Sequence, residues 1–258
     1  MLDFAVEIAR EAGEILMNAY GRIERANVGY KGWRNLVTEA DLAVERHVAR
    51  RIEERFPTHG ILGEERIHKD PSPGEGHRWV VDPLDGTTNF VHAHPFFCTS
   101  IGLEKDGEGI VGVVFAPYLE ELYTASAGAG AALNGVGCRV SEEPDLAHAL
   151  LASGFAYGQD RDPNTNLENW GRLSLVARGL RRCGSAALDL CYVACGRYEG
   201  FWELYLGAWD IAAGAVLVRE AGGRVTDLED GDTWRDGHEI LATNGLLHEA
   251  IRGRLIDV

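Results

Sequence analysis

Two aspartates, Asp82 and Asp85, lie in the segment WVVDPLDGTTNF at residues 79–90. Three large apolar residues precede Asp82, so the pattern predicts a buried strand that ends at Asp82 and leads into a turn that contains Asp85. Buried ionised carboxylates require compensation, and this segment contains neither Lys nor Arg. Divalent cations prefer oxygen ligands and would compensate the charge directly. The spacing therefore favours a metal site over salt bridges or a purely structural acidic turn.

The residues that follow Asp82 suit a metal and a phosphate together. Pro83 fixes its own φ and biases Asp82 toward an extended conformation, so the Leu84 carbonyl and both carboxylates can converge on one side. Residues 86–88, Gly-Thr-Thr, would present free backbone N–H groups if a short helix begins there. A helix start beside metal ions is a natural seat for a phosphate group.

Other acidic residues fall at the ends of further predicted elements. Glu64 closes the apolar run GILGEE at 60–65, and Asp210 stands at the start of the predicted helix WDIAAGAVLVREAGG at 209–223. As an alternative to a metal ligand, Asp210 is a candidate helix N-cap. We expect these acids to join Asp82 and Asp85 in one site.

The first half of the chain must position these residues with two helices and several strands. Apolar spacing predicts a helix over residues 2–20 and a second from Thr38 to Pro57, where Thr38 and Asp41 form a capping-box pattern. Residues 22–37 are expected to form a hairpin or mobile loop. Strands are predicted at 60–65 and 78–82, followed by a hairpin at 99–117 that turns at 105–107 and by two more strands through about residue 135.

After residue 145 strands and helices alternate. Strands are predicted at 149–155, 180–183, 201–204, 224–228 and 240–244, and helices at 166–178, 185–196, 209–223 and from about 246. The order indicates an α+β fold in which helix layers pack around two sheets.

Composition excludes several classes of protein. The formal charge of −15 argues against nonspecific nucleic-acid binding, which needs Lys and Arg to neutralise phosphates. No segment has the uninterrupted apolar length that spans a bilayer, and residues 1–21 carry acids unlike a signal peptide. We therefore expect a cytoplasmic protein without a membrane partner. Five cysteines without CxxC spacing indicate free thiols.

Three motifs resemble the inositol monophosphatase family, within the superfamily that includes fructose-1,6-bisphosphatases. They are GEE at 63–65, WVVDPLDGTTNFVH at 79–92 and WDIAAGAVLVREAGG at 209–223. The resemblance implies a layered αβαβα sandwich in which residues 1–258 form one catalytic domain. Its two packed halves would be about 1–145, carrying metal and phosphate, and about 146–258, facing the substrate. It also implies a homodimer and inhibition by lithium.

The resemblance further implies roles for individual residues. Glu64, Asp82 and the Leu84 carbonyl would hold one Mg²⁺. Asp82, Asp85 and Asp210 would hold a second, and a weaker third ion would bind at Glu64. Asp41 and Thr87 would orient the attacking water, so that Asp41, Thr87 and Glu64 are the implied catalytic residues. Without the resemblance, Asp41 would be interpreted as a helix-capping acid.

Substrate contacts are implied in the same way. The residues concerned are Gly86, Thr87, Ser185, Ala187, Glu203 and Asp210, with Lys31 as a possible contact from a loop. Glu203 matches the family acid that accepts hydrogen bonds from inositol hydroxyls. Helix N-capping is the alternative for Ser185, and an exposed solvated side chain is the alternative for Lys31.

The implied function is Mg²⁺-dependent hydrolysis of a small phosphorylated polyol, above all inositol-1-phosphate, with Mn²⁺ as a possible substitute metal. Alternative activities are those of a fructose-1,6-bisphosphatase, a histidinol-phosphatase or a 3′-phosphoadenosine-5′-phosphate phosphatase. A non-catalytic metal-binding regulatory protein is the alternative from another class. His92 and His94 do not predict zinc, because no cysteine or acid nearby completes a tetrahedral set.

Overall fold

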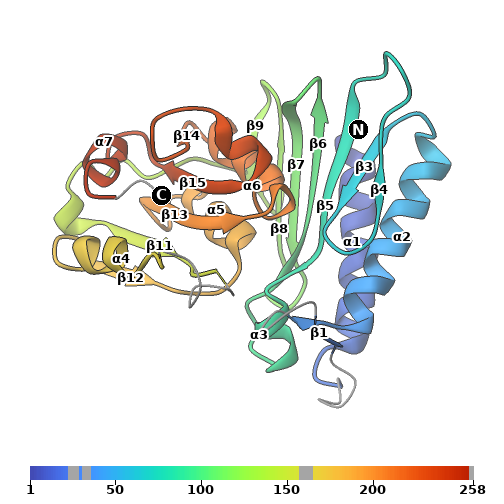
Figure 1. Ribbon diagram of the computed structural model, residues 1–258, viewed down its shortest axis with the longest axis horizontal. Helices are drawn as coiled ribbons and strands as arrows, with labels where there is room; N and C mark the ends of the chain where they lie inside the picture. The colour runs from blue at the N-terminus through green and yellow to red at the C-terminus, as the bar shows by residue number, and fades with distance from the viewer. Residues whose placement is uncertain (23–28, 31–35, 157–164, 256–258) are drawn as a thin grey trace.

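Five layers make up the structure, a computed structural model that describes residues 1–22, 29–30, 36–156 and 165–255. Helices α1 and α2 cover the outer face of an eight-stranded sheet, helices α5 and α6 lie between that sheet and a five-stranded one, and α4 and α7 lie on the far side (Figure 1). The helix bounds are α1 Leu2–Ala19, α2 Glu39–Arg55, α3 Thr87–Val91, α4 Leu167–Ser174, α5 Ala186–Ala194, α6 Ala208–Glu220 and α7 His248–Arg252. This arrangement confirms the expected αβαβα sandwich.

The larger sheet has the strand order β10-β9-β8-β7-β6-β5-β3-β4. Its strands are β3 Gly60–Gly63, β4 His68–Lys69, β5 His77–Asp85, β6 Cys98–Lys105, β7 Glu108–Ala116, β8 Glu121–Ser126, β9 Gly130–Leu133 and β10 Val136–Cys138. Strands β3 and β5 run parallel, and every other neighbouring pair is antiparallel. The parallel pair brings the ends of β3 and β5, and so Glu64 and Asp82, to one edge of the sheet.

The smaller sheet has the order β12-β11-β13-β15-β14. Its strands are β11 Leu150–Ser153, β12 Gly179–Arg181, β13 Gly200–Leu206, β14 Arg224–Thr226 and β15 His238–Thr243. Strand β11 lies parallel to both of its neighbours, so β11 and β13 end on the same side. A short hairpin of β1 (Gly29–Tyr30) and β2 (Leu36–Val37) precedes α2 and agrees with the hairpin expected at 22–37.

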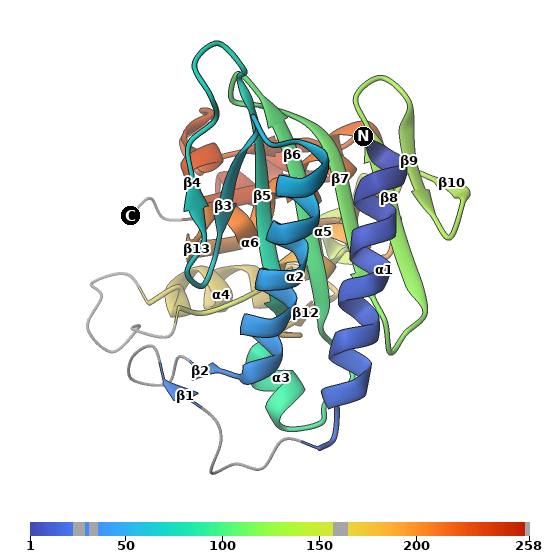
Figure 2. The same cartoon turned by 90° about the vertical axis from the view of Figure 1, so that its right-hand side faces the viewer.

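Three apolar clusters hold the layers together. One lies between α1, α2 and the larger sheet, where the two long helices lie side by side over the strands (Figure 2). The second surrounds α5 and α6, and the third lies under α4 and α7. Helices α5 and α6 approach closely because α6 carries small residues. A Cβ added at Gly214 would lie only 2.5 Å from the Leu190 side chain.

Some element boundaries differ from the sequence prediction. The predicted helix 166–178 ends at Ser174, after which the Val176 N–H bonds to the Leu173 carbonyl three residues back in place of the regular i−4 partner. Strands expected at 149–155, 180–183 and 224–228 are shorter or shifted, at 150–153, 179–181 and 224–226. Strand β5 runs on through Asp85 rather than stopping at Asp82. Among the described helices, none is both long and apolar enough to cross a membrane.

Candidate active site

Strand β5 ends in an irregularity that turns its last residues toward the second sheet. Its pairing with β6 shifts register between Asp82 and Asp85, at the position where Pro83 has no N–H for the ladder. The Leu84 N–H donates to Asp82 Oδ1 at 3.0 Å, and the Thr99 hydroxyl donates to the Asp82 carbonyl at 3.3 Å. These bonds fix both aspartates at the end of a rigid buried strand, as the sequence predicted.

A cavity of about 220 Å³ opens beside this strand end. Its walls include residues from both sheets and from the starts of α3, α5 and α6. Every predicted metal ligand lines it, namely Glu64, Asp82, Leu84, Asp85 and Asp210. The predicted substrate contacts Gly86, Thr87, Ser185 and Glu203 line it as well, with Gly154, Arg182 and Trp209 among the remaining residues.

Asp41 lies behind this cavity, fully buried at the start of α2. Its Oδ2 accepts the Thr38 N–H at 2.8 Å and the Thr38 hydroxyl, which completes the predicted capping box. Its Oδ1 lies 3.2 Å from the Thr87 hydroxyl, which also lies 3.1 Å from the Leu84 carbonyl. Burial raises the pKa of Asp41 to about 6, against the opposing effect of the Thr38 hydrogen bonds. Capping and contact with Thr87 therefore coexist in one carboxylate.

Gly86 occupies a backbone position that excludes other residues. Its φ is 91°, in the left-handed region, where it forms the N-cap of α3. A Cβ there would also lie 2.9 Å from the Phe96 carbonyl and 3.3 Å from the Gly184 carbonyl. The tight turn keeps Asp85 and Thr87 on the cavity wall.

The segment that carries Glu64 is held by Glu45, a residue that the sequence analysis did not single out. Glu45 is buried on α2, and its Oε1 accepts the N–H groups of Glu65 at 2.9 Å and Arg66 at 3.1 Å. Gly63 leaves room for this carboxylate, since a Cβ there would lie 2.3 Å from Glu45 Oε1. Glu45 stands four residues after Asp41 on the same helix face, a spacing that could have suggested a shared role.

Asp210 lies inside the first turn of α6 rather than at the N-cap. The N-cap is Gly207, and the Asp210 carboxylate accepts the Gly207 N–H at 2.6 Å from the third helical position. The N-cap alternative for Asp210 is therefore wrong. The carboxylate still contributes to the helix start, because it satisfies one of the unpaired N–H groups there.

Asp85 connects the two halves of the cavity. Its Oδ2 accepts the Ser185 hydroxyl at 2.7 Å and the Ala187 N–H at 2.7 Å. Ser185 also caps α5 by accepting the Leu188 N–H at 3.4 Å, so the capping alternative and the contact with the site are both present. Burial raises the pKa of Asp85 to about 6, while the bonds from Ser185 and Ala187 lower it.

The remaining acids repel one another in the absence of cations. Burial, followed by the charges of Glu64, Asp85 and Asp210, raises the pKa of Asp82 well above its usual value. The pKa of Asp210 is raised by burial and by Asp85 and Glu64. Carboxylates and a carbonyl are the donors that Mg²⁺ and Mn²⁺ prefer. These oxygen donors therefore fit divalent cations, and bound cations would relieve the repulsion between the carboxylates.

The sequence analysis missed two further charged residues, one in the cavity wall and one buried in α5. Arg182 lines the cavity beside Glu203, and Asp189 lies fully buried in the first turn of α5 with no hydrogen-bond partner for its Oδ1. Burial, then Glu203 and Asp85, raises the pKa of Asp189. An acid inside the apolar run SAALDLC was the only sequence signal for Asp189.

Three other candidates lie outside this arrangement. Lys31 falls outside the described residues. His92 and His94 are exposed just beyond α3 and do not line the cavity. Their position agrees with the prediction that they lie in a loop after the turn at residues 86–88.

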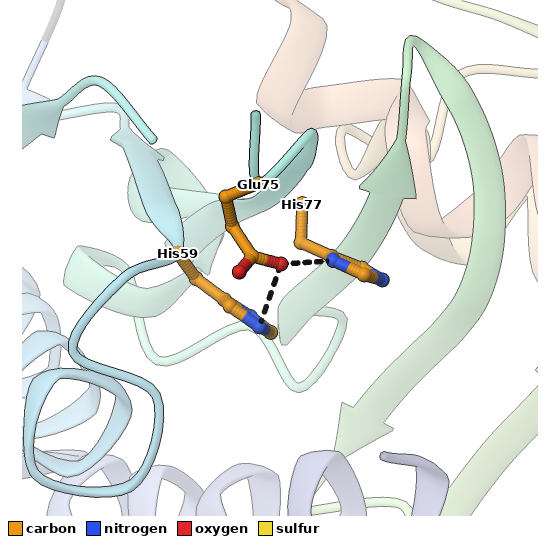
Figure 3. A group of neighbouring side chains, drawn as sticks. All are labelled: His59, Glu75 and His77. Atoms are coloured by element: carbon orange, nitrogen blue, oxygen red, sulfur yellow. Dashed lines mark hydrogen bonds and ion pairs between the residues drawn. The ribbon is translucent and has the colours of Figure 1, made fainter. Parts of the chain in front are cut away.

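A separate group of ligand-type side chains, His59, Glu75 and His77, lies at the opposite end of β5 (Figure 3). His77 and Asp85 are the first and last residues of that strand, roughly 26 Å apart at the usual rise per residue. Both imidazoles face Glu75 Oε1, with His77 Nδ1 at 2.5 Å and His59 Nε2 at 3.5 Å.

The geometry of these three residues does not suit a metal. Trp79 Nε1 donates to His59 Nδ1 at 3.0 Å, which places the proton of a neutral His59 on Nε2, the nitrogen that a cation would need. The two imidazoles also stack at 4.7 Å between centroids and 11° between planes, so their in-plane lone pairs cannot meet at one ion. The group is a hydrogen-bonded network that fastens the start of β5.

Comparison with known proteins agrees with this geometry. The sequence model of the inositol monophosphatase family matches residues 1–256. The chain is 43% identical over 257 residues to Nus factor SuhB of Pseudomonas aeruginosa, covering 97% of this chain and 94% of the relative. It is 40% identical to the inositol-1-monophosphatase of Rhizobium meliloti, covering 98% and 94%.

Solved structures of similar sequence share the fold. The extragenic suppressor protein suhB of Bartonella henselae superposes with a TM-score of 0.92 at 38% identity, covering 98% of this chain and 96% of that one. The inositol monophosphatase of Anabaena gives 0.87 at 40% identity, covering 98% and 94%.

Proposed function

The chain belongs to the inositol monophosphatase family, and from that premise we propose that it hydrolyses a phosphate monoester of a small polyol, inositol-1-phosphate above all, with Mg²⁺. One observation carries the proposal most strongly. The carboxylates of Glu64, Asp82, Asp85 and Asp210, from three segments of the chain, line a single cavity. We propose that the two sheets, residues about 1–145 and about 146–258, act as one catalytic domain, since this cavity draws on both.

In the proposed site the acids hold two or three cations. Glu64, Asp82 and the Leu84 carbonyl would hold one, and Asp82, Asp85 and Asp210 another. When bound, such ions supply an activated water and stabilise the charge on the leaving oxygen. The N–H groups of Gly86 and Thr87 would bind the phosphate oxygens, in a turn that the positive φ of Gly86 keeps narrow.

Thr87 and Asp41 would orient the attacking water. The Thr87 hydroxyl can donate its one proton either to the Leu84 carbonyl at 3.1 Å or to Asp41 Oδ1 at 3.2 Å. With a cation on the Leu84 carbonyl it would donate to Asp41, which leaves its lone pairs for a water in the cavity. Because Thr38 fixes the other oxygen of Asp41, the carboxylate cannot rotate freely. The pair therefore holds the water in one orientation at a small entropic cost.

The leaving group would face Glu203 and Ser185. A carboxylate accepts hydrogen bonds from polyol hydroxyls and repels a second phosphate, which favours inositol-1-phosphate over bisphosphates. Arg182 weakens this preference, because it lines the same cavity and its positive charge would attract a second phosphate. Fructose-1,6-bisphosphate is therefore the alternative substrate that a specific residue supports.

The test is phosphate release from four substrates: inositol-1-phosphate, fructose-1,6-bisphosphate, histidinol phosphate and 3′-phosphoadenosine-5′-phosphate. Each would be assayed with Mg²⁺, with Mn²⁺, with Mg²⁺ plus lithium and with chelator. The proposal expects fastest turnover of inositol-1-phosphate, dependence on the divalent ion and inhibition by lithium. Preferred turnover of another substrate would reject the polyol assignment.

A regulatory role is the second candidate, because relatives from Pseudomonas aeruginosa and Pasteurella multocida carry the name Nus factor SuhB. The presence of all the proposed ligands in one cavity supports catalysis in this chain. Absence of turnover on all four substrates with either metal would favour the regulatory role. We also propose a homodimer, which measurement of the molar mass in solution would test.

A further inference from the structure

One wall of the cavity is formed where β11 ends beside β13. The two strands run parallel with Ser153 opposite Trp202, so Gly154 follows directly alongside Glu203. Trp202 packs into the cluster under α4 and α7, whereas Phe201 packs into the cluster around α5 and α6. Because side chains alternate along a strand, Glu203 shares the inner face with Phe201 and reaches the cavity.

The Glu203 carboxylate occupies the space that a side chain at residue 154 would fill. A Cβ added to Gly154 would lie 2.1 Å from Oε1, 2.2 Å from Cδ and 2.2 Å from Oε2. Ordinary van der Waals contact begins near 3.4 Å, so the carboxylate would have to move by about 1 Å. The three atoms form the far end of a flexible side chain, so Glu203 would yield before the backbone does.

The charges around Glu203 depend on where its carboxylate lies. Burial raises the pKa of Glu203 to about 8, Arg182 opposes that rise and Asp85 adds to it. A carboxylate displaced from Gly154 would therefore lose its present balance between one cation and one anion. It would also narrow the space that a leaving group can occupy, since both residues line the cavity.

We propose that Gly154 is a positioning residue for substrate selection: by lacking a side chain, it lets the Glu203 carboxylate lie back in the wall and accept hydrogen bonds from the hydroxyls of a polyol leaving group. The inference rests on the proposed phosphatase function. It assigns Gly154 no part in holding cations or water, because the three atoms nearest to a Cβ at residue 154 all belong to the Glu203 carboxylate.

The experiment compares G154A, E203A and the double variant with two substrates. Inositol-1-phosphate has a leaving group rich in hydroxyls, and p-nitrophenyl phosphate has none. For G154A we expect kcat/KM to fall about tenfold or more with inositol-1-phosphate and less than about threefold with p-nitrophenyl phosphate. In the E203A background, G154A should cause no further loss. An equal fall with both substrates, or a further loss in the double variant, would overturn the proposal.

Thermal unfolding provides a readout that does not depend on turnover. G154A should lower Tm in the wild-type background and leave it unchanged in the E203A background, because E203A removes all three clashing atoms. G171A is the matched control, since a Cβ at that position of α4 meets nothing within 4 Å. G171A should leave both the kinetics and the substrate ratio unchanged.

The outcomes separate this proposal from the function on which it rests. If the wild type hydrolyses neither ester, the proposed function and the selection role both fail, while the Tm comparison still reports the contact between Gly154 and Glu203. If the wild type hydrolyses both esters and G154A keeps the wild-type substrate ratio, only the role of Gly154 fails.

Discussion

The Ser185 hydroxyl donates to Asp85 Oδ2 at 2.7 Å, across a separation of 100 residues in the chain. Asp85 belongs to the larger sheet, and Ser185 begins the helix that packs between the sheets. The Ala187 N–H reaches the same oxygen at 2.7 Å. A proposed metal ligand is thus oriented by the half of the protein that we propose faces the substrate. In the proposed site, metal binding and substrate binding would therefore depend on the same contact.

Replacing Ser185 should weaken metal binding. S185A removes one of two short donors to Asp85, so we expect the Mg²⁺ concentration for half-maximal activity to rise about tenfold, the usual effect of losing a residue that orients a ligand. Activity measured against Mg²⁺ concentration would test this. S174A is the control, because the exposed Ser174 hydroxyl donates to the Gly171 carbonyl of its own helix. An unchanged Mg²⁺ requirement in S185A would contradict the account.

Thr87 should act through its hydroxyl. T87A removes the group that links Asp41 to the cavity, whereas T87S retains it. We expect T87A to lower kcat by about 10²-fold or more with little change in KM, the size of effect typical for positioned proton-transfer groups. T87S should remain within a few-fold of the wild type. Equal losses of kcat in T87A and T87S would show that the Thr87 methyl group, and therefore its packing, determines the rate rather than the hydroxyl.

Glu45 should support the segment that carries Glu64. E45Q keeps one carbonyl oxygen but turns Oε2, which lies 3.1 Å from the Arg66 N–H, into an NH₂ donor and removes the charge that strengthens these hydrogen bonds. We therefore expect a loss of about 1–3 kcal/mol in the free energy of unfolding. Chemical denaturation would measure it. E54Q lies on the same helix in an exposed pair with Arg50 and should cost less than about 1 kcal/mol. Equal stability of E45Q and E54Q would contradict this role.

Without divalent ions, the protein should lose stability as pH rises from about 6.5 to 9. The folded-state pKa of Glu203 is raised to about 8, and the pKa values of Asp82, Asp189 and Asp210 are also raised by burial and by neighbouring carboxylates. The unfolded chain has already released these protons in this pH range, so the folded state binds more of them. The free energy of unfolding therefore falls as the pH rises. Burial lowers the pKa of His248 to about 4. Below pH 6.5 the contribution of His248 to stability therefore increases with pH, opposite to that of the raised carboxylates.

Denaturation in chelator at several pH values would measure this fall, and Mg²⁺ should reduce it because bound ions favour the charged carboxylates. E203Q should make the profile flatter, since it removes the group that titrates near pH 8. A stability that stays constant or increases from pH 6.5 to 9 in chelator would contradict the account.

Local chemistry explains which parts of the structure the sequence could predict. The capping box of Thr38 and Asp41 and the turn at Gly86 depend on neighbouring residues, so short patterns predict them. The strand that carries Asp82 was predicted from its apolar run, but its extension to Asp85 was not, because Pro83 interrupts the pattern.

The contacts that refine the site depend on register between distant segments. Glu45 reaches the segment after β3, and Gly154 reaches Glu203, only because particular helices and strands lie side by side. No short pattern encodes such a pairing. The end of α4 was missed for a related reason, since apolar spacing continues past Ser174 while the backbone already turns toward β12.

The central claim is that the acids in the cavity jointly bind divalent cations that drive hydrolysis. The most direct measurement is the rate of phosphate release from inositol-1-phosphate by D82N and by the wild type at saturating Mg²⁺. In the proposed site Asp82 is the acid that both ion positions share, so the account predicts that D82N is slower than the wild type by about 10³-fold or more. A D82N enzyme that is folded and within a few-fold of the wild-type rate would contradict it.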